Sequence, residues 1–295
     1  MQPRSRLAIV LNPTAGQGRS GRRVERVLRL LRREATVELI PTERAGDAEA
    51  AARGASARGV DAVIAAGGDG TINEVLNGLA GSATPLGVIP CGTANVLAAE
   101  LGLPRRPEAL AALLAHGPVR DIWVGQAGGR RFALMASAGI DADIVRDVEP
   151  ALKRSIGKGA FVWALLGALA RYSPKNLVVR VGDRALAASQ VLVAKAARYG
   201  GNFVAAPQAS IDRPEFIVYA INAPSCCAVL GLAAALVRGR LAQHPMVEML
   251  RAREVSLESA DEAALQADGE LFGTLPTRIA IDPRQARVIA PVTAG

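Results

Sequence analysis

The chain of 295 residues is poor in cysteine, histidine and aromatic residues. Three cysteines, of which Cys226 and Cys227 are adjacent, are too few for a disulfide framework, so we expect a reduced, cytoplasmic setting. The two histidines, His116 and His244, lie far apart, and no Cys/His spacing typical of zinc is present. Aromatic residues make up 3% of the chain, which argues against the stacking surfaces of single-strand nucleic-acid-binding proteins. We therefore expect no nucleic-acid partner.

Long apolar runs are also lacking. The longest, Ala160–Ala170 and Cys226–Val237, are shorter than the roughly 20 apolar residues that span a bilayer. The run Leu7–Leu11 near the N-terminus ends in Asn12-Pro13 and is too short for a signal sequence. Both longer runs are long enough to lie on a membrane surface, although apolar runs of this length more often form buried or amphipathic helices.

The chain carries an excess of positive charge and is longer than a usual single domain. Thirty-five Lys and Arg against 27 Asp and Glu give a formal charge of +8, which favours anionic partners such as phosphates or acidic membrane surfaces. Half of the residues are apolar, as in a packed globular protein. A chain longer than the usual domain of about 100–200 residues predicts two domains.

The first part of the chain alternates short β runs with helical patterns. The predicted strands are 7–11, 36–40, 61–66 and 86–89, and the predicted helices are about 22–32, 47–57, 72–79, 95–101 and 107–116. This alternation is typical of a parallel sheet with helices on both faces. We predict an open α/β nucleotide-binding domain over residues 1–121.

The pattern changes after Asp121. Many short β runs follow, interrupted by helical patches near 156–172 and 225–241; the predicted strands are 132–137, 177–181, 191–195, 202–206, 216–222, 254–258, 263–266, 278–281 and 287–289. Short strands separated by Gly, Pro and Asp indicate a β-sandwich. The predicted fold class is thus α/β plus all-β, with a β-rich substrate domain over residues 122–295. The last residues of this range are also candidates for a part of the first domain.

Three loops rich in Gly, Thr and Asn each follow a predicted strand and precede a predicted helix. They are Asn12–Gly18, Gly67–Glu74 and Pro90–Asn95. Glycine allows a ligand to approach the backbone closely, helix N-termini favour phosphate, and the carboxyl ends of parallel strands meet at one edge. None matches a Walker motif or a dinucleotide turn. A nucleotide-phosphate site is predicted, although Asp69 as the cap of a tight turn is an alternative reading of the central loop.

These loops resemble the three signatures of the diacylglycerol kinase catalytic-domain family, which includes bacterial lipid kinases and sphingosine kinases and is more distantly related to NAD kinases. Thr42 before Gly46-Asp47-Ala48, Asp121, Lys153–Gly159, Tyr199–Gly201 and Asp268–Glu270 extend the resemblance over nearly the whole chain. The resemblance implies a kinase that uses ATP and Mg²⁺ to phosphorylate a lipid hydroxyl, with diacylglycerol as the leading acceptor and a role in phospholipid biosynthesis. The lipid would enter between the two domains.

Site residues follow from the resemblance, position by position. The implied ATP-binding residues are Asn12, Pro13, Thr14, Ala15, Gly16, Thr42, Gly67, Gly68, Asp69, Gly70, Thr71, Ile72, Asn73, Glu74, Gly92 and Thr93. Glu270 is implied as the acceptor of the hydroxyl proton, and Asp69 as a further catalytic residue that helps either with this proton or with Mg²⁺. If the segment is extended, Asp268 lies on the same face as Glu270 and is a candidate Mg²⁺ ligand. Without the resemblance, a hairpin turn is the favoured interpretation of Asp268-Gly-Glu270.

Two positions depart from the family pattern. Family members usually carry an aspartate in the second domain that binds a structural Mg²⁺ with the help of nearby carbonyls, and Arg213 stands in its place. A guanidinium cannot ligate a cation, so we expect this metal site to be lost unless Asp212 substitutes for the missing acid. Val96 stands where many members have an aspartate after the third loop.

Two alternatives remain open. One is an NAD kinase-like enzyme, since Gly-Gly-Asp-Gly-Thr is shared, and the other is a catalytically weak lipid-binding or regulatory protein, which Arg213 and Val96 favour. For the lipid kinase we expect peripheral association with the inner face of the membrane, where the lipid substrate lies. A homodimer is a candidate assembly of this chain.

Overall fold

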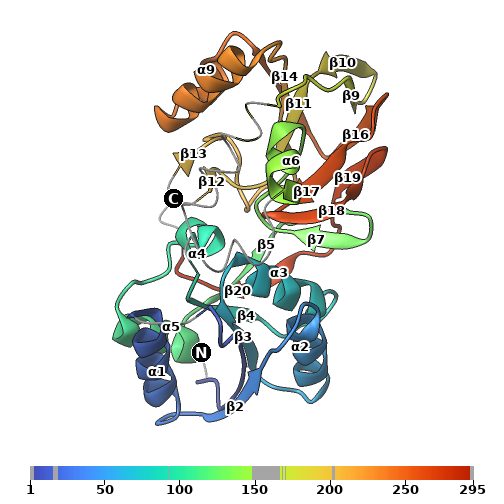
Figure 1. The fold of residues 1–295 in the computed structure, drawn as a ribbon. Helices are drawn as coiled ribbons and strands as arrows, with labels where there is room; N and C mark the ends of the chain where they lie inside the picture. The colour runs from blue at the N-terminus through green and yellow to red at the C-terminus, as the bar shows by residue number, and fades with distance from the viewer. Residues whose placement is uncertain are drawn as a thin grey trace. The chain divides into compact units, whose positions relative to one another are not determined.

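The structure is a computed structural model and describes residues 3–15, 19–92, 94–147, 167, 169, 171–200 and 203–292. The chain divides into two compact units. Unit 1 contains Met1–Trp123 and Pro283–Gly295, and unit 2 contains Val124–Asp282. Figure 1 shows the elements of both units.

Unit 1 is built on a six-stranded sheet in the order β2-β1-β3-β4-β20-β5. Its strands are β1 (Arg6–Leu11), β2 (Thr36–Pro41), β3 (Ala62–Gly67), β4 (Leu86–Pro90), β5 (Val119–Ile122) and β20 (Ala286–Ile289). All neighbouring pairs run parallel except β20 and β5, which are antiparallel. β3 is buried along its whole length, which explains its unbroken apolar sequence.

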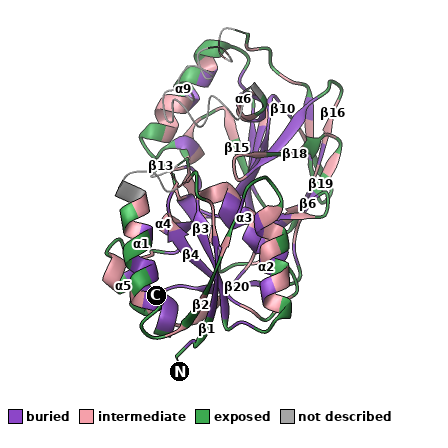
Figure 2. Ribbon diagram, turned by 60° about the horizontal axis from the view of Figure 1, so that its bottom comes forward, coloured by how far each residue is buried: buried purple, intermediate pink, exposed green. Residues whose placement is uncertain are grey.

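Helices cover both faces of this sheet (Figure 1). They are α1 (Arg19–Leu31), α2 (Asp47–Ala57), α3 (Asp69–Gly78), α4 (Val96–Glu100) and α5 (Pro107–His116). On one face α1 and α5 pack through Val27, Leu31 and Leu114, while the outer side of α1 is exposed (Figure 2). The predicted open parallel α/β fold is confirmed. α3 begins at Asp69, about three residues earlier than predicted.

The strand order places a topological switch point between β1 and β3. From β1 the chain moves to β2 on one side and then to β3 and β4 on the other. In open α/β sheets a ligand binds outside the carboxyl ends of the strands at such a point. The segments after Leu11 and after Gly67 are therefore the two walls of the expected crevice in unit 1.

Unit 2 contains two six-stranded antiparallel sheets, in the orders β10-β9-β16-β19-β6-β7 and β15-β14-β11-β8-β17-β18. The first comprises β6 (Gly125–Ala127), β7 (Arg130–Phe132), β9 (Leu177–Val181), β10 (Arg184–Ala188), β16 (Glu254–Ser259) and β19 (Thr277–Ile281). The second comprises β8 (Met135–Ala138), β11 (Gln190–Ala194), β14 (Phe216–Ile221), β15 (Val247–Ala252), β17 (Ala264–Ala267) and β18 (Glu270–Thr274). The remaining described elements are α6 (Ile140–Asp147), β12 (Arg198–Tyr199), β13 (Phe203–Val204), α9 (Cys226–Val237) and a short 3-10 helix (Leu241–Gln243).

Alternate residues of the two sheets form one apolar core, as in a sandwich. Leu177 and Val179 of β9 belong to this core together with Val191 and Val193 of β11. The rings of Phe132 and Phe216, one from each sheet, stack with centroids 6.0 Å apart. The predicted antiparallel β-rich fold is confirmed.

Several predicted boundaries in unit 2 differ from the structure. The single strand predicted over 132–137 is two strands, β7 and β8, because Ala133 and Leu134 direct their N–H groups to the carboxylate of Asp268. The strands β6, β10, β12, β15 and β18 and the helix α6 were not predicted. Most of the helical patch expected over 156–172 lies outside the described residues.

Candidate active site

The loop after β1 is tied to β3 and to α3 by Asn12. Its backbone N–H donates to Ala66 O at 3.0 Å, and its side-chain Nδ2 donates to Thr71 Oγ1 at 3.3 Å. Asn12 Oδ1 accepts from both the N–H and the hydroxyl of Thr14, at 3.0 and 2.8 Å. An asparagine side chain that bonds to the backbone two residues later forms an Asx-turn, which fixes the direction of the chain. Gly16, the last of the implied ATP-binding residues in this loop, lies outside the described residues.

Gly67, the last residue of β3, is required by close packing. A Cβ atom on Gly67 would lie 2.5 Å from the side chain of Thr71. Gly68, in an extended conformation, precedes the first turn of α3, which starts with Asp69. The first N–H groups of a helix lack partners within the helix, and they are the usual donors to a bound phosphate.

The loop after β4 lies against this glycine turn. Cys91 N–H donates to Gly67 O at 2.9 Å, and a Cβ on Gly92 would be 2.7 Å from the Cα of Gly68. Asn95, in the left-handed conformation with φ of 49°, closes the loop by accepting from Gly92 N–H at 2.9 Å and donating to Gly92 O at 2.6 Å. Thr93 lies outside the described residues.

Asp69 links two of the three loops. Its Oδ1 accepts a hydrogen bond from Val96 N–H, the first residue of α4, at 2.8 Å. Burial raises the pKa of Asp69 above its ordinary value, while hydrogen bonds from backbone N–H groups, Val96 foremost, act in the opposite direction. An acid in an anion-binding loop thus has a structural use here, and its catalytic role stays a prediction.

The other sequence-predicted nucleotide residues are placed less directly. Thr42 donates from its backbone N–H to Leu11 O at 2.9 Å, next to the Asn12 loop. Glu74 Oε2 accepts from Ala48 N–H at 3.1 Å, at the start of α2. Ile72 and Asn73 are buried in α3. The structure therefore brings Asn12, Thr14, Gly67, Gly68, Asp69, Thr71 and Gly92 together, whereas Glu74 turns toward α2.

In unit 2, Asp268 and Glu270 lie at a hairpin between β17 and β18. Asp268 and Gly269 both have positive φ, 50° and 83°, so they form the turn itself. The expectation that Asp268 and Glu270 share one face of an extended segment is wrong, because left-handed residues reverse the chain between them.

The carboxylate of Asp268 anchors this hairpin to the segment between β7 and β8. It accepts from the N–H groups of Ala133, Leu134 and Met135 at 2.7, 3.0 and 3.0 Å. Three such donors take up most of the roughly four lone-pair positions of a carboxylate. The structure thus gives Asp268 an anchoring role, and its role as a Mg²⁺ ligand stays a prediction.

Glu270, the first residue of β18, has a third of its side chain exposed. Its Oε2 pairs with Arg130 at 3.3 Å, and Arg130 also lies over the ring of Phe272, 4.4 Å from the ring centroid. The ring and the carboxylate hold the guanidinium between them. The accessible carboxylate of Glu270 is thus placed beside a fixed cation.

A polar network that the sequence did not predict is hydrogen-bonded to the hairpin between β17 and β18. Gln266 Oε1 accepts from Gly269 N–H at 3.0 Å, and Gln266 Nε2 donates to Ser137 Oγ and Asp141 Oδ2 at 2.6 and 2.8 Å. Asp141 Oδ1 accepts from the Tyr199 hydroxyl at 2.5 Å. Burial, and then the charge of Asp141, raise the pKa of Tyr199 well above its ordinary value, so this hydroxyl stays a donor.

Comparison with known proteins decides the family. Residues 6–127 match the diacylglycerol kinase catalytic domain, and residues 135–290 match the YegS C-terminal NAD kinase beta sandwich-like domain. A diacylglycerol kinase of Bacillus subtilis (strain 168) is 30% identical over 292 residues, which cover 97% of this chain and 96% of that protein. The chain belongs to the diacylglycerol kinase family. The predicted family and the predicted enzyme class, a lipid kinase-type phosphotransferase, are confirmed.

Further relatives agree with this assignment to the diacylglycerol kinase family. A diacylglycerol kinase of Staphylococcus saprophyticus is 27% identical, over 92% of this chain and 91% of its own. A crystal structure of a diacylglycerol kinase from Bacillus anthracis strain Sterne has a TM-score of 0.75, 18% identity and full coverage of both chains. A second structure from that strain reaches a TM-score of 0.83 at 20% identity, covering 100% of this chain and 98% of its own. The solved structures share the fold.

The structural Mg²⁺ that the diacylglycerol kinase family implies in unit 2 does not fit the residues present. Arg213 replaces the expected acid, and its guanidinium lies 3.9 Å from the carboxylate of Glu215. Among the described residues no group of three His, Cys, Asp or Glu side chains could hold a metal ion. A catalytic Mg²⁺ needs no such group, because Mg²⁺ is commonly held by substrate phosphates, waters and one or two carboxylates.

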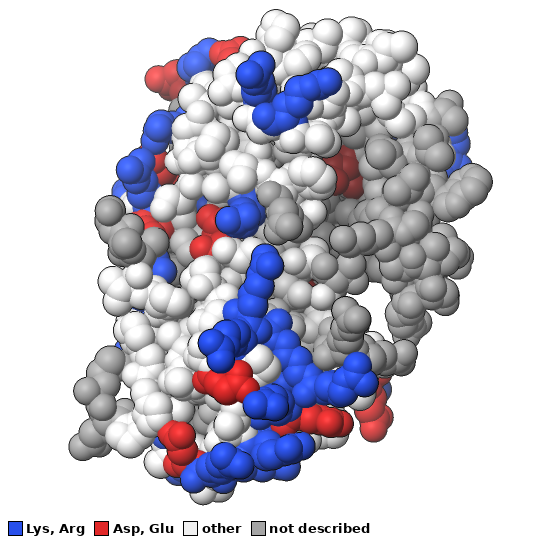
Figure 3. Space-filling view, turned by 90° about the vertical axis from the view of Figure 1, so that its left-hand side faces the viewer, with Lys and Arg blue, Asp and Glu red and all other residues white. Residues whose placement is uncertain are grey.

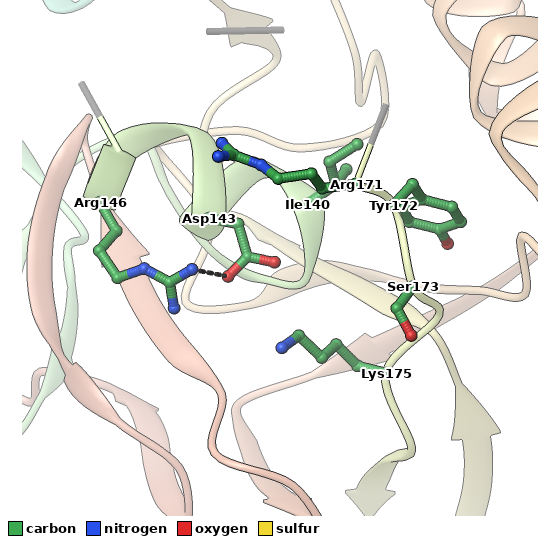
Figure 4. Close-up of a pocket in the computed structure, with 7 residues that line it drawn as sticks. All are labelled: Ile140, Asp143, Arg146, Arg171, Tyr172, Ser173 and Lys175. Carbon is green, nitrogen blue, oxygen red and sulfur yellow. Dashed lines mark ion pairs between the residues drawn. The ribbon is translucent and has the colours of Figure 1, made fainter. Parts of the chain in front are cut away.

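Unit 2 also contains a cavity that the sequence did not predict (Figure 4). Arg146, Arg171 and Lys175 line it, and Arg146 pairs with Asp143 at 3.1 Å. Basic side chains outnumber acidic ones in this lining, which suits an anionic group. No sequence motif identified it, because its residues come from α6 and from the segment before β9.

Proposed function

We propose that this protein uses ATP to phosphorylate the hydroxyl group of a membrane lipid, with diacylglycerol as the favoured acceptor. The observation that carries the proposal is the contact between the loops at the carboxyl ends of β1, β3 and β4, where Asn12, Gly68 and Gly92 meet the start of α3. Those loops offer backbone N–H groups to phosphates, and relatives along nearly the whole chain are named diacylglycerol kinases.

Within this proposal the two units supply different parts of the chemistry. The loops of unit 1 bind the phosphates of ATP, and Mg²⁺ held with those phosphates would neutralise their charge during transfer. Glu270 in unit 2 accepts the proton of the lipid hydroxyl as its oxygen bonds to the γ-phosphorus and the bond to ADP breaks. The network of Gln266 and the anchor of Asp268 hold the hairpin that carries Glu270.

The lipid acceptor requires contact with a membrane, and we assign that contact to exposed apolar and basic side chains. On α9 the side chains of Leu230 and Val237 are 52% and 65% exposed, and the exposed Arg238 and Arg240 follow the helix. In Figure 3, Lys and Arg side chains gather in the lower part of the view, where unit 1 lies. No helix among the described residues is long and apolar enough to cross a bilayer. Apolar insertion combined with basic contacts supports peripheral association with an anionic surface.

A phosphorylation assay on purified full-length protein tests the proposal. Vesicles of phosphatidylglycerol carry diacylglycerol, sphingosine or a simple long-chain alcohol, ATP is supplied with Mg²⁺, and NAD is the soluble control acceptor. We expect phosphorylated diacylglycerol as the main product. Phosphorylation of NAD alone would favour the NAD kinase-like alternative, and ATP binding without any phosphorylated product would favour the regulatory one.

Vesicle flotation tests the membrane contact separately. We expect binding to phosphatidylglycerol vesicles that weakens steeply with added salt, because salt screens exposed charges over a Debye length of about 10 Å at 0.1 M. Equal binding to neutral vesicles, or binding that salt leaves unchanged, would contradict a contact made by Arg and Lys.

A further inference from the structure

Lys195, the residue that follows β11, is fully buried, with no exposed surface in the structure. Its Nζ donates to the backbone carbonyl of Ser210 and, at 3.3 Å, to that of Glu215. These two carbonyls lie on either side of Arg213, the position at which the family pattern has its metal-binding aspartate. A positively charged group therefore already occupies the carbonyl-lined side of this loop.

The chemistry of the loop excludes a second cation at the same carbonyls. A backbone carbonyl oxygen uses the same lone pairs to accept a hydrogen bond from an ammonium group or to coordinate a metal ion, so the two cations compete for it. A divalent ion beside the buried Lys195 would meet strong repulsion in a low-dielectric environment. Glu215 offers no compensation, because its carboxylate is directed to Arg251 at 2.7 Å and to Arg213.

We propose that the ammonium group of Lys195 takes the place of the structural Mg²⁺ in unit 2. The loop of residues 207–215 is then held by a cation that belongs to the chain itself, and its order does not depend on the concentration of free Mg²⁺. This assignment also accounts for Arg213, because an acid at that position is no longer needed to bind a metal.

The position of Lys195 connects the loop to the catalytic hairpin. The N–H groups of Lys195 and Ala196 both donate to Leu134 O, at 2.8 and 2.9 Å. Leu134 N–H in turn donates to the carboxylate of Asp268. Lys195 thus belongs to one series of hydrogen bonds that runs from Ser210 and Glu215 to the hairpin of Glu270. This connection does not depend on which lipid is the acceptor.

Metal binding to nucleotide-free, full-length protein tests this inference without any activity measurement. The probe is Mn²⁺, counted by electron paramagnetic resonance, and the melting temperature is measured with Mg²⁺ and with a chelator. Four proteins are compared: the parent, Arg213→Asp, Lys195→Met, and the double variant Lys195→Met/Arg213→Asp. Lys175→Met is the matched control for loss of a lysine in unit 2.

We expect the parent and Arg213→Asp to bind the same number of Mn²⁺ ions and to melt at temperatures that Mg²⁺ does not change. Lys195→Met should melt at a lower temperature, and Mg²⁺ should not restore it. The double variant should gain one Mn²⁺ per chain and a melting temperature that rises with Mg²⁺, because the carbonyls are vacated and an acid is restored.

Three results would overturn the inference. They are an additional Mn²⁺ in Arg213→Asp while Lys195 is present, a Mg²⁺-dependent melting temperature in the parent, and a folded double variant that gains no Mn²⁺. If the Lys195 variants fail to fold, the comparison of the parent with Arg213→Asp still decides, since a gained ion refutes the proposal and an unchanged count supports it.

Discussion

The two units fix their functional loops by different means. In unit 1 the loops touch through glycine backbones and amide side chains, as at Gly68, Gly92 and Asn95. In unit 2 the hairpin and the loop of residues 207–215 are held by charged groups, the carboxylate of Asp268 and the ammonium of Lys195, bonded to backbone atoms. Small neutral residues leave backbone N–H groups available to a phosphate. Buried charges hold the backbone in one arrangement, but removal of a charge or of its hydrogen-bond partner lowers the free energy of unfolding strongly.

The largest effect is expected at Glu270, the proposed proton acceptor in the unit 2 hairpin, a third of whose side chain is exposed. Glu270→Gln keeps the shape and the hydrogen bonding of the side chain but cannot accept a proton. General base catalysis contributes about 10²–10⁴-fold, so the rate of lipid phosphorylation should fall by that factor. ATP binding, a property of the unit 1 loops, should be unchanged in a calorimetric titration.

The control for this change is Glu258→Gln, which removes a carboxylate of unit 2 that pairs with Arg180 at 2.9 Å on the surface. Its rate should match that of the parent. If Glu270→Gln were as active as Glu258→Gln on every lipid, Glu270 would not be the base.

The second prediction concerns the anchor of the same hairpin. Asp268→Ala leaves the buried N–H groups of Ala133, Leu134 and Met135 without their acceptor and places alanine at a positive φ. We expect a loss of about 3 kcal/mol or more in the free energy of unfolding, measured with urea. Asp268→Asn, which tolerates this backbone conformation and keeps one oxygen, should lose less.

Asp261→Ala, an exposed acid in the same unit, serves as the control and should change stability by no more than about 0.5 kcal/mol. Equal stabilities of the Asp268 and Asp261 variants would show that charge does not hold the hairpin. The contrast between the units would then be lost.

The sequence predicted the unit 1 loops far better than the anchors of unit 2, for a physical reason. Parallel strands bring their carboxyl ends to one edge, so three short motifs after three strands were enough to place Asn12, Gly68 and Gly92 together. Lys195 gave no such signal, because a lysine at a strand end is usually exposed, and its partners here are backbone carbonyls. Gln266 was missed likewise, as its partners are far away in the sequence.

The third prediction tests the neutral contacts of unit 1. A Cβ on Gly92 would lie 2.7 Å from the Cα of Gly68, whereas a Cβ on Gly68 would lie 3.5 Å from the Cα of Gly92. Gly92→Ala should therefore force the loops apart, lowering the free energy of unfolding by about 1–3 kcal/mol and weakening ATP binding. Gly68→Ala should unfold at nearly the same urea concentration as the parent. Equal losses from the two substitutions would mean that the spacing between the loops does not matter.

The smallest expected effect concerns Asp69, a partly buried acid beside the glycine contacts of unit 1. Burial raises its pKa in the folded protein above its ordinary value near 3.8. Stability contributed by this group is therefore fully present below the unfolded pKa and is lost as the pH rises through the raised folded pKa. Relative to Asp69→Asn, which does not titrate, the parent should lose stability as the pH rises from about 3.8 through the raised folded pKa, and its stability should then stay level.

Asp47 provides the opposite sign within the same unit. Hydrogen bonds from the N–H groups of Glu43 and Arg44 lower the pKa of Asp47 below its ordinary value, so its contribution is present at neutral pH and is lost as the pH falls through the folded pKa. Urea unfolding of the parent, Asp69→Asn and Asp47→Asn, measured from below the folded pKa of Asp47 up to neutral pH, should give two difference curves of opposite slope. If the Asp69 curve instead followed that of Asp47, the N–H groups of the α4 start would outweigh burial. Unit 1 would then contain a charge-held anchor of the same kind as Asp268.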